Sequence, residues 1–172
     1  SAGITNDMIY QKFLTQTLKE ASKIANEMFG KVSVKTKDHD ASQALTEADL
    51  KIGKFIIAEI EKHYRDHNII NEESGVIDKK SEWTWVIDPI DGTIFFAHGT
   101  PFFGVMSGLM RGDEPYAGGV ALPFFHEIYL AEKGQGAYFG NQKLDIRNLE
   151  LATADIIAYA PAPRGNDPEI TR

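Results

Sequence analysis

The chain of 172 residues is long enough for one domain with a sizeable core, and its composition, 42% hydrophobic and 25% charged, is that of an ordinary globular protein. Its 25 acidic and 18 basic residues give a net charge of −7, which argues against nucleic acid as a partner because binding a phosphate backbone requires a basic face. The lack of cysteine excludes disulfides and zinc–thiolate sites and fits a cytoplasmic location, and no apolar run is long enough for a membrane span.

The first third of the chain predicts two amphipathic helices. Residues 6–29 carry apolar side chains at helical spacing; Thr5 or Asn6 can cap the start, and Gly30 can end the helix. A second helix is predicted over residues 46–64, again with its apolar side chains on one side.

Short β-rich runs follow, broken by Gly, Pro, Asn and Asp. They are NIIN, WTWVID, FFGVMSGLM, YAGGVAL, EIYLAEK and GAYFG. Helices followed by a strand meander predict an α+β fold in which two N-terminal helices pack on a mostly antiparallel sheet.

The last residues predict the start of a second unit. ADIIAYA is typical of a strand, and the Asp-Pro-Glu at residues 167–169 is typical of the first turn of a helix, which the sequence does not continue. We therefore expect residues 1–160 to form an N-terminal domain and residues 161–172 to begin a second α/β domain that this chain lacks.

The most informative stretch is W-V-I-D-P-I-D-G-T, in which an apolar strand runs into two carboxylates. Pro89 fixes φ and removes an N–H, so the turn can bring Asp88, Asp91 and the carbonyl of Ile90 into one small volume. Oxygen ligands without His or Cys favour a hard cation such as Mg²⁺, with Mn²⁺ as a substitute. The alternative interpretation is an ordinary Asp-Pro turn at a strand end.

The residues after Asp91 can contribute to the same site. Gly92 allows the backbone to approach a ligand closely, and if Thr93 opens a helix, the amides of Gly92 and Thr93 can face an anion. The following His98 is expected to be a hydrogen-bonded structural histidine.

Two further acidic motifs have both a structural and a functional interpretation. Glu72-Glu73 follows an apolar strand; it can be a solvated turn, or it can add carboxylates if its strand neighbours the one ending in Asp88. Thr46-x-x-Asp49 approximates a capping box, which the spacing favours, although Asp49 could also accept a hydrogen bond from a catalytic hydroxyl.

Taken together, these motifs resemble the inositol monophosphatase family of Mg²⁺-dependent phosphatases, whose superfamily includes fructose-1,6-bisphosphatases and phosphatases of 3′-phosphoadenosine 5′-phosphate. The matching segments are T-E-A-D (46–49), E-E-S (72–74), W-V-I-D-P-I-D-G-T (85–93), H-G-x-P-F (98–102) and G-Q-G-A-Y-F-G-N-Q-K-L (134–144). They span nearly the whole chain. The resemblance implies that this chain is the first half of a five-layer αβαβα fold.

By position, the resemblance implies one ion held by Glu72, Asp88 and the Ile90 carbonyl, and a second held by Asp88 and Asp91. Glu72 would also serve a weaker third site. The implied cofactor is Mg²⁺, two or three ions, with Mn²⁺ able to replace it and Ca²⁺ acting as an inhibitor.

The resemblance also implies the catalytic roles. Asp49 and Thr93 would orient and activate the attacking water, with Glu72 as a further catalytic residue. Asp91 and the amides of Gly92 and Thr93 would hold the substrate phosphate. The partners implied are a small phosphorylated substrate and, in the full-length protein, a second copy in a homodimer.

The sequence departs from the family pattern at three points. Phe95 stands where many members have Asn, Asn71 stands where a Gly usually precedes the two glutamates, and no Trp-Asp dipeptide of the family's second domain occurs. We expect an Mg²⁺-dependent phosphomonoesterase acting on inositol monophosphate. The alternatives are a phosphatase of fructose 1,6-bisphosphate or 3′-phosphoadenosine 5′-phosphate, and a metal-binding module without catalysis.

Overall fold

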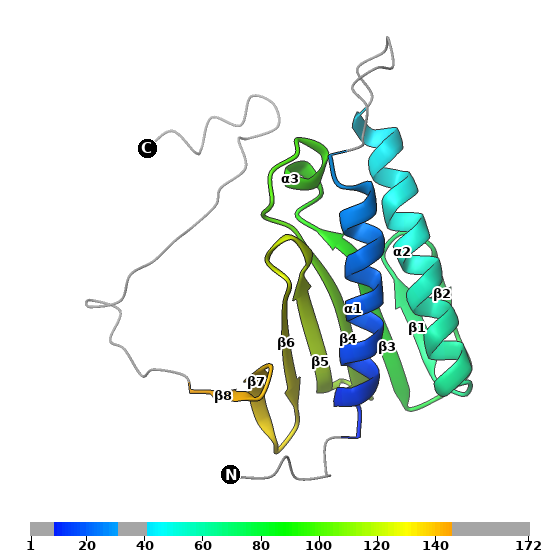
Figure 1. The fold of residues 1–172 in the computed structure, drawn as a ribbon. Helices are drawn as coiled ribbons and strands as arrows, with labels where there is room; N and C mark the ends of the chain where they lie inside the picture. Colours follow the sequence, from blue (N-terminus) through cyan, green and yellow to red (C-terminus); the bar gives the residue numbers. More distant parts are fainter. Residues whose placement is uncertain (1–8, 31–40, 146–172) are drawn as a thin grey trace, which may run out of the picture.

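The computed structural model describes residues 9–30 and 41–145; the strand and helix start predicted beyond residue 150 lie outside these ranges. Two long helices lie side by side on one face of a single sheet (Figure 1). The helical segments are α1 (Gln11–Met28), α2 (Ala41–His63), the short α3 (Thr93–Ala97) and the 3-10 turn η1 (Pro123–Phe125). None of the helices in the described ranges combines the length and apolar character needed to cross a membrane.

The described strands form one sheet in the order β2-β1-β3-β4-β5-β6-β7-β8. They are β1 (Asn68–Asn71), β2 (Gly75–Ile77), β3 (Trp83–Asp91), β4 (Gly104–Arg111), β5 (Glu114–Leu122), β6 (Glu127–Glu132), β7 (Gly136–Phe139) and β8 (Gln142–Leu144). β1 and β3 are parallel, and every other neighbouring pair is antiparallel. The predicted α+β fold, with two helices on a mostly antiparallel sheet, is confirmed.

The ends of α1 differ in how well local sequence predicted them. Its N-cap is Tyr10, so the helix begins later than the predicted residue 6. The predicted caps Thr5 and Asn6 lie outside the described residues. The Tyr10 amide donates to a carboxylate oxygen of Glu132 on β6, 3.3 Å away in space and 122 residues away along the chain. At the other end, Gly30 has a φ of +70° just after the last turn, which confirms the predicted stop.

An aromatic cluster around the fully buried Trp85 joins the helices to the sheet. The rings of Tyr10, Phe13 and Tyr64 lie 5.9, 5.2 and 5.3 Å from the ring of Trp85. These contacts tie the start of α1 and the end of α2 to the first half of β3. They anchor the strand whose other end carries Asp88 and Asp91.

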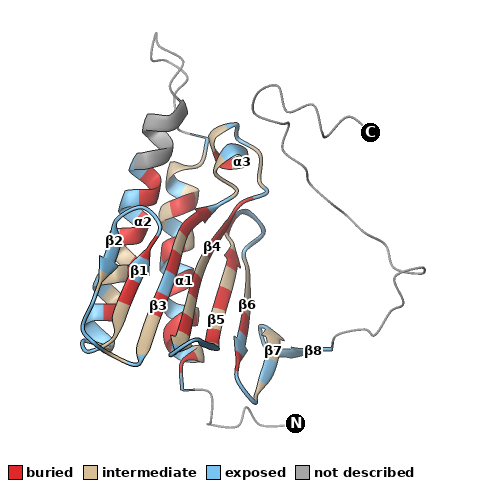
Figure 2. Ribbon diagram, turned by 180° about the vertical axis from the view of Figure 1, so that it is seen from behind, coloured by how far each residue is buried: buried red, intermediate tan, exposed pale blue. Residues whose placement is uncertain are grey.

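Seen from the side away from the helices, the central strands alternate between buried residues and partly or fully exposed ones (Figure 2). Along this face Val86 of β3 pairs with Gly108 of β4, which in turn pairs with Gly118 of β5. Val86 is 37% exposed and Ile70 of β1 is 40% exposed. In the described part of the chain, this apolar face has no covering layer.

Candidate active site

The end of β3 contains an irregularity that turns two carboxylates toward one cavity. Between Asp88 and Asp91 the pairing with β4 shifts register, so that Pro89 and Ile90 lie in a bulge. In a regular strand, residues three apart point to opposite faces of the sheet. Because of the bulge, Asp88 and Asp91 both line the same cavity.

The turn that follows Asp91 requires a glycine. Gly92 is the N-cap of α3 and has a left-handed φ of +83°, and a Cβ at this position would lie 2.7 Å from the carbonyl oxygen of Phe102. A side chain is therefore disfavoured by both conformation and space. Thr93 is the first residue of α3, which meets the condition for the amides of Gly92 and Thr93 to face an anion, and both residues line the cavity.

The second pair of acids reaches the same edge because β1 runs parallel to β3. Asn71, the last residue of β1, pairs with Ile87, the residue before Asp88. The Glu72 amide then donates to the Ile87 carbonyl at 3.4 Å. Glu72 and Glu73 therefore emerge beside the end of β3, as the functional interpretation of the two glutamates requires.

Asp49 enters the cavity from α2. This helix begins well before Thr46, so the interpretation of Thr46 as an N-cap is wrong. Asp49 is only 3% exposed. Burial, together with repulsion from the carboxylates of Glu73, Asp88 and Glu72, raises the pKa of this carboxyl group to about 7.

These segments enclose a cavity of about 260 Å³. It is lined by Asp49, Glu72, Glu73, Asp88, Ile90, Asp91, Gly92 and Thr93. The structure thus brings together every site residue that the sequence predicted. It also brings in Glu73, the second residue of the E-E pair, which the resemblance did not assign to an ion.

The electrostatics of the cavity are dominated by unpaired acids. Five of its lining residues are carboxylates and none is basic. Burial, and then the charges of Glu72 and Asp91, raise the pKa of Asp88 to about 6, while a backbone hydrogen bond from Ile90 opposes part of this rise. Such a cavity attracts cations, and by itself it repels a phosphate.

The donor set fits a hard divalent cation. Carboxylate and carbonyl oxygens without imidazole or thiolate are the ligands that Mg²⁺ prefers. Within residues 9–30 and 41–145, however, no three carboxylate or imidazole groups already converge tightly enough to hold one ion. Repulsion between unpaired carboxylates opposes such convergence, and a bound cation would remove that repulsion. The assignment of each ligand to an individual ion stays a prediction.

Two residues that follow Thr93 have structural contacts. The Nδ1 atom of His98 lies 2.8 Å from the Ile94 carbonyl oxygen, which confirms His98 as a hydrogen-bonded structural histidine. The ring of Phe95 packs edge-on against Phe102, with centroids 6.2 Å apart. Phe95 thus belongs to the packing around the Gly92 turn.

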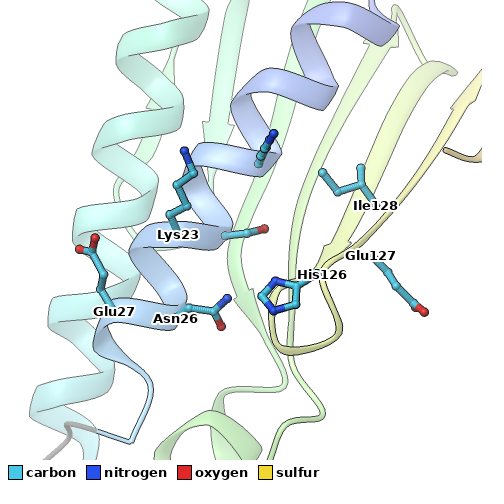
Figure 3. Close-up of a pocket in the computed structure, with 8 residues that line it drawn as sticks. Lys23, Asn26, Glu27, His126, Glu127 and Ile128 are labelled. Carbon is cyan, nitrogen blue, oxygen red and sulfur yellow. The ribbon is translucent and has the colours of Figure 1, made fainter.

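A larger groove of about 550 Å³ lies between α1 and the turn from β5 to β6 (Figure 3). It is lined by Lys19, Ser22, Lys23, Asn26, Glu27, His126, Glu127 and Ile128. Some of its polar groups are already paired: the Asn26 amide donates to the Pro123 carbonyl at 2.9 Å, and Lys23 pairs with Glu20 at 2.7 Å. The smaller cavity, where charged groups of one sign converge, is therefore the better candidate for catalysis.

Comparison with known proteins identifies the family of this chain. The profile of the Inositol monophosphatase family matches residues 9–168. A "Fructose-1,6-bisphosphatase/inositol-1-monophosphatase" of Aquifex aeolicus is 34% identical over 146 residues, which cover 84% of this chain and 55% of the relative. "Inositol monophosphatase 1" of Bos taurus is 35% identical over 146 residues, covering 83% of this chain and 50% of the relative.

Solved structures show the same relationship. The extragenic suppressor protein suhB of Bartonella henselae superimposes with a TM-score of 0.70 at 27% identity, covering 80% of this chain and 54% of that one. The chain thus spans about half the length of the relatives it matches. With the family profile matching most of its length, this chain belongs to the inositol monophosphatase family.

Proposed function

We propose that this chain supplies the N-terminal metal-binding domain, residues 1–160, of an enzyme that hydrolyses a phosphate monoester with Mg²⁺; residues 161–172 would begin the second domain. The observation that carries the proposal is the cavity in which five carboxylates from α2, the β1–β2 turn and β3 meet beside the start of α3. An acidic cavity can hold an anionic substrate when bound cations reverse its local charge.

In this proposal the metal ligands are distributed over two segments. Glu72, Asp88 and the Ile90 carbonyl would hold one ion, Asp88 and Asp91 a second, and Glu72 a weaker third. Divalent ions supply charge neutralisation and an activated water in such sites. Mn²⁺ would replace Mg²⁺, and Ca²⁺ would inhibit because it favours more ligands and longer distances.

The remaining residues position the reactants. Asp49 and Thr93 would orient the attacking water, with Glu72 assisting, and the buried Asp49 carboxyl, with its pKa near 7, can hold or release a proton at neutral pH. The amides of Gly92 and Thr93 at the start of α3, together with Asp91, would align the phosphate for in-line displacement.

Inositol monophosphate is the leading substrate, because the family and the relatives carry its name. Fructose 1,6-bisphosphate, named for the Aquifex relative, and 3′-phosphoadenosine 5′-phosphate are the enzymatic alternatives. We further propose that the full-length protein is a cytoplasmic homodimer.

Phosphate release from these three compounds by the full-length protein, measured with and without Mg²⁺, tests the proposal. We expect Mg²⁺-dependent release from at least one of them. Asp88→Asn should abolish it, whereas Asp113→Asn, in the exposed β4–β5 turn away from the cavity, should leave it unchanged. Mg²⁺ binding without release from any compound would instead identify a metal-binding module without catalysis.

A further inference from the structure

Asn71 is a buried polar residue in contact with two of the segments that line the acidic cavity. It is 3% exposed and ends β1, where it is paired with Gly75 on one side and Ile87 on the other. Its Oδ1 atom accepts a hydrogen bond from the Glu73 amide at 3.2 Å. The side chain therefore holds the turn that carries Glu72 and Glu73 in a defined position.

The other end of the same side chain meets α2 at Gly53. A Cβ on Gly53 would lie 2.6 Å from the Nδ2 atom of Asn71 and 3.4 Å from the ring of Pro89. Glycine destabilises a helix interior, so its presence here is explained by the space it leaves for its neighbours. Gly53 follows Asp49 by one helical turn, and the two residues lie on the same face of α2.

We propose that Asn71 is a positioning residue for the carboxylate cluster. Its amide lies between α2, which carries Asp49, and the turn that carries Glu72 and Glu73, and its backbone is paired with β3 next to Asp88. It sets the spacing of three acid-bearing segments, and Gly53 makes room for it. The inference rests on the proposed metal-dependent function, because this spacing determines how the carboxylates share a cation.

A second asparagine on the same strand provides a matched control. Asn68 begins β1 and, like Asn71, uses its side chain to hold a loop: its Oδ1 accepts hydrogen bonds from the amides of Lys79 and Ser81 at 2.8 and 3.2 Å. It lies at the opposite end of β1 from the acids. If Asn71 only held the local backbone, its replacement should have the same effects as replacement of Asn68: lower stability and unchanged Mg²⁺ affinity.

The first experiment compares Asn71→Gly and Asn68→Gly in the full-length protein. Asn71→Gly should weaken Mg²⁺ binding, measured by calorimetry, by about 10-fold, as expected when a residue that orients metal ligands is lost. The Mg²⁺ concentration for half-maximal phosphate release should rise in parallel, while the substrate KM at saturating Mg²⁺ stays the same. Asn68→Gly should lower the melting temperature and leave Mg²⁺ affinity unchanged.

The second experiment displaces Asn71 without altering it. Gly53→Ala should push the amide away and so weaken Mg²⁺ binding and lower the melting temperature. Once Asn71→Gly has emptied the space, the same Gly53→Ala change should raise the melting temperature, because alanine favours the helix. If Asn71→Gly alone is too unstable to assay, the double variant is compared with Gly53→Ala: adding Asn71→Gly should then raise the melting temperature, because it removes the group that the new Cβ would meet at 2.6 Å.

The outcomes separate the two proposals. If the wild type binds Mg²⁺ and both Asn71→Gly and Gly53→Ala retain its affinity, the positioning role is wrong and the proposed function stands. If the wild type neither binds Mg²⁺ nor depends on it for phosphate release, the proposed function fails, and the positioning role fails with it.

Discussion

Asp49 and Asp88 are carboxyl groups whose surroundings favour the protonated form. Their pKa values are raised from 3.8 to about 7 and about 6, first by burial and then by neighbouring acids. A raised folded-state pKa of an acid means that the folded protein binds protons more tightly than the unfolded chain. The resulting stabilisation is complete below about pH 4 and is lost as the pH rises through 6 and 7. In the absence of cations, these two groups should therefore make the folded state less stable at pH 8 than at pH 5.

Asp88→Asn should accordingly stabilise the metal-free protein while abolishing catalysis. At pH 8 we expect a gain of about 1 kcal/mol, allowing for the partial exposure of Asp88, which is a rise of a few degrees in melting temperature. At pH 4 the gain should vanish, because the native Asp88 is already neutral there. Thermal unfolding in a chelator at both pH values measures this, with Asp113→Asn as the control. A variant that is destabilised at pH 8 would show that Asp88 has a stabilising partner.

At the scale of the elements, Trp85 and His67 join β3 to the segment after α2. The indole Nε1–H of Trp85 donates to Nδ1 of His67 at 3.1 Å, and the His67 ring stacks on Tyr64 and Trp83. Burial lowers the pKa of His67, and Asp66 opposes this shift in part. Protonation would place a hydrogen on the nitrogen that accepts from Trp85, so the neutral ring is the one that fits.

This pair predicts a loss of stability in acid, opposite in sign to the effect of the cavity acids. A base with a lowered folded-state pKa contributes stability above its unfolded value of 6.5, and that contribution is lost as the pH falls through the folded pKa. His67→Gln should be less stable than the wild type at pH 8, and the difference should shrink toward pH 5. Urea unfolding followed by tryptophan fluorescence at the two pH values measures the difference. An equal difference at both would exclude titration of His67 as its cause.

At the scale of the whole molecule, the two faces of the sheet differ. The helices α1 and α2 cover one face, while Val86 and Ile70 remain partly exposed on the other. Three exposed phenylalanines, Phe102, Phe124 and Phe125, also meet beyond the strand ends, with ring centroids 5.5 and 6.2 Å apart between neighbours. Exposed apolar surfaces of this kind favour association.

We therefore expect the 172-residue chain on its own to self-associate. The combined change Ile70→Thr and Val86→Thr should reduce association, because threonine keeps the β-branched shape but adds a hydroxyl. Ile9→Thr is the control, since Ile9 is 70% exposed and lies just before α1, outside the sheet. Light scattering over a concentration series measures the mass. A chain that is monomeric throughout would contradict the expectation.

Local spacing predicted the fold class and most of the candidate site. Apolar residues at helical spacing identified α1 and α2. The end of α1 at Gly30 could be predicted because it depends on the conformation of a single residue, and the positive φ of Gly30 confirms it. The carboxylates of Asp88 and Asp91 were predicted to converge because a proline lies between them. The structure shows how they converge: a bulge in β3 between Asp88 and Asp91 turns both carboxylates to the same side.

Contacts between distant segments decided the rest. Tyr10, the N-cap residue of α1, donates its amide to Glu132 of β6, 122 residues away, a contact that no local pattern could predict. The buried position of Asp49 and the fit of Asn71 against Gly53 likewise arise from α2 packing on β1 and β3. Sequence patterns determine which chemistry a chain can perform, because that depends on residue types at short spacing. The burial, charge and separation of those groups depend on strand pairing and helix packing, which only the folded chain establishes.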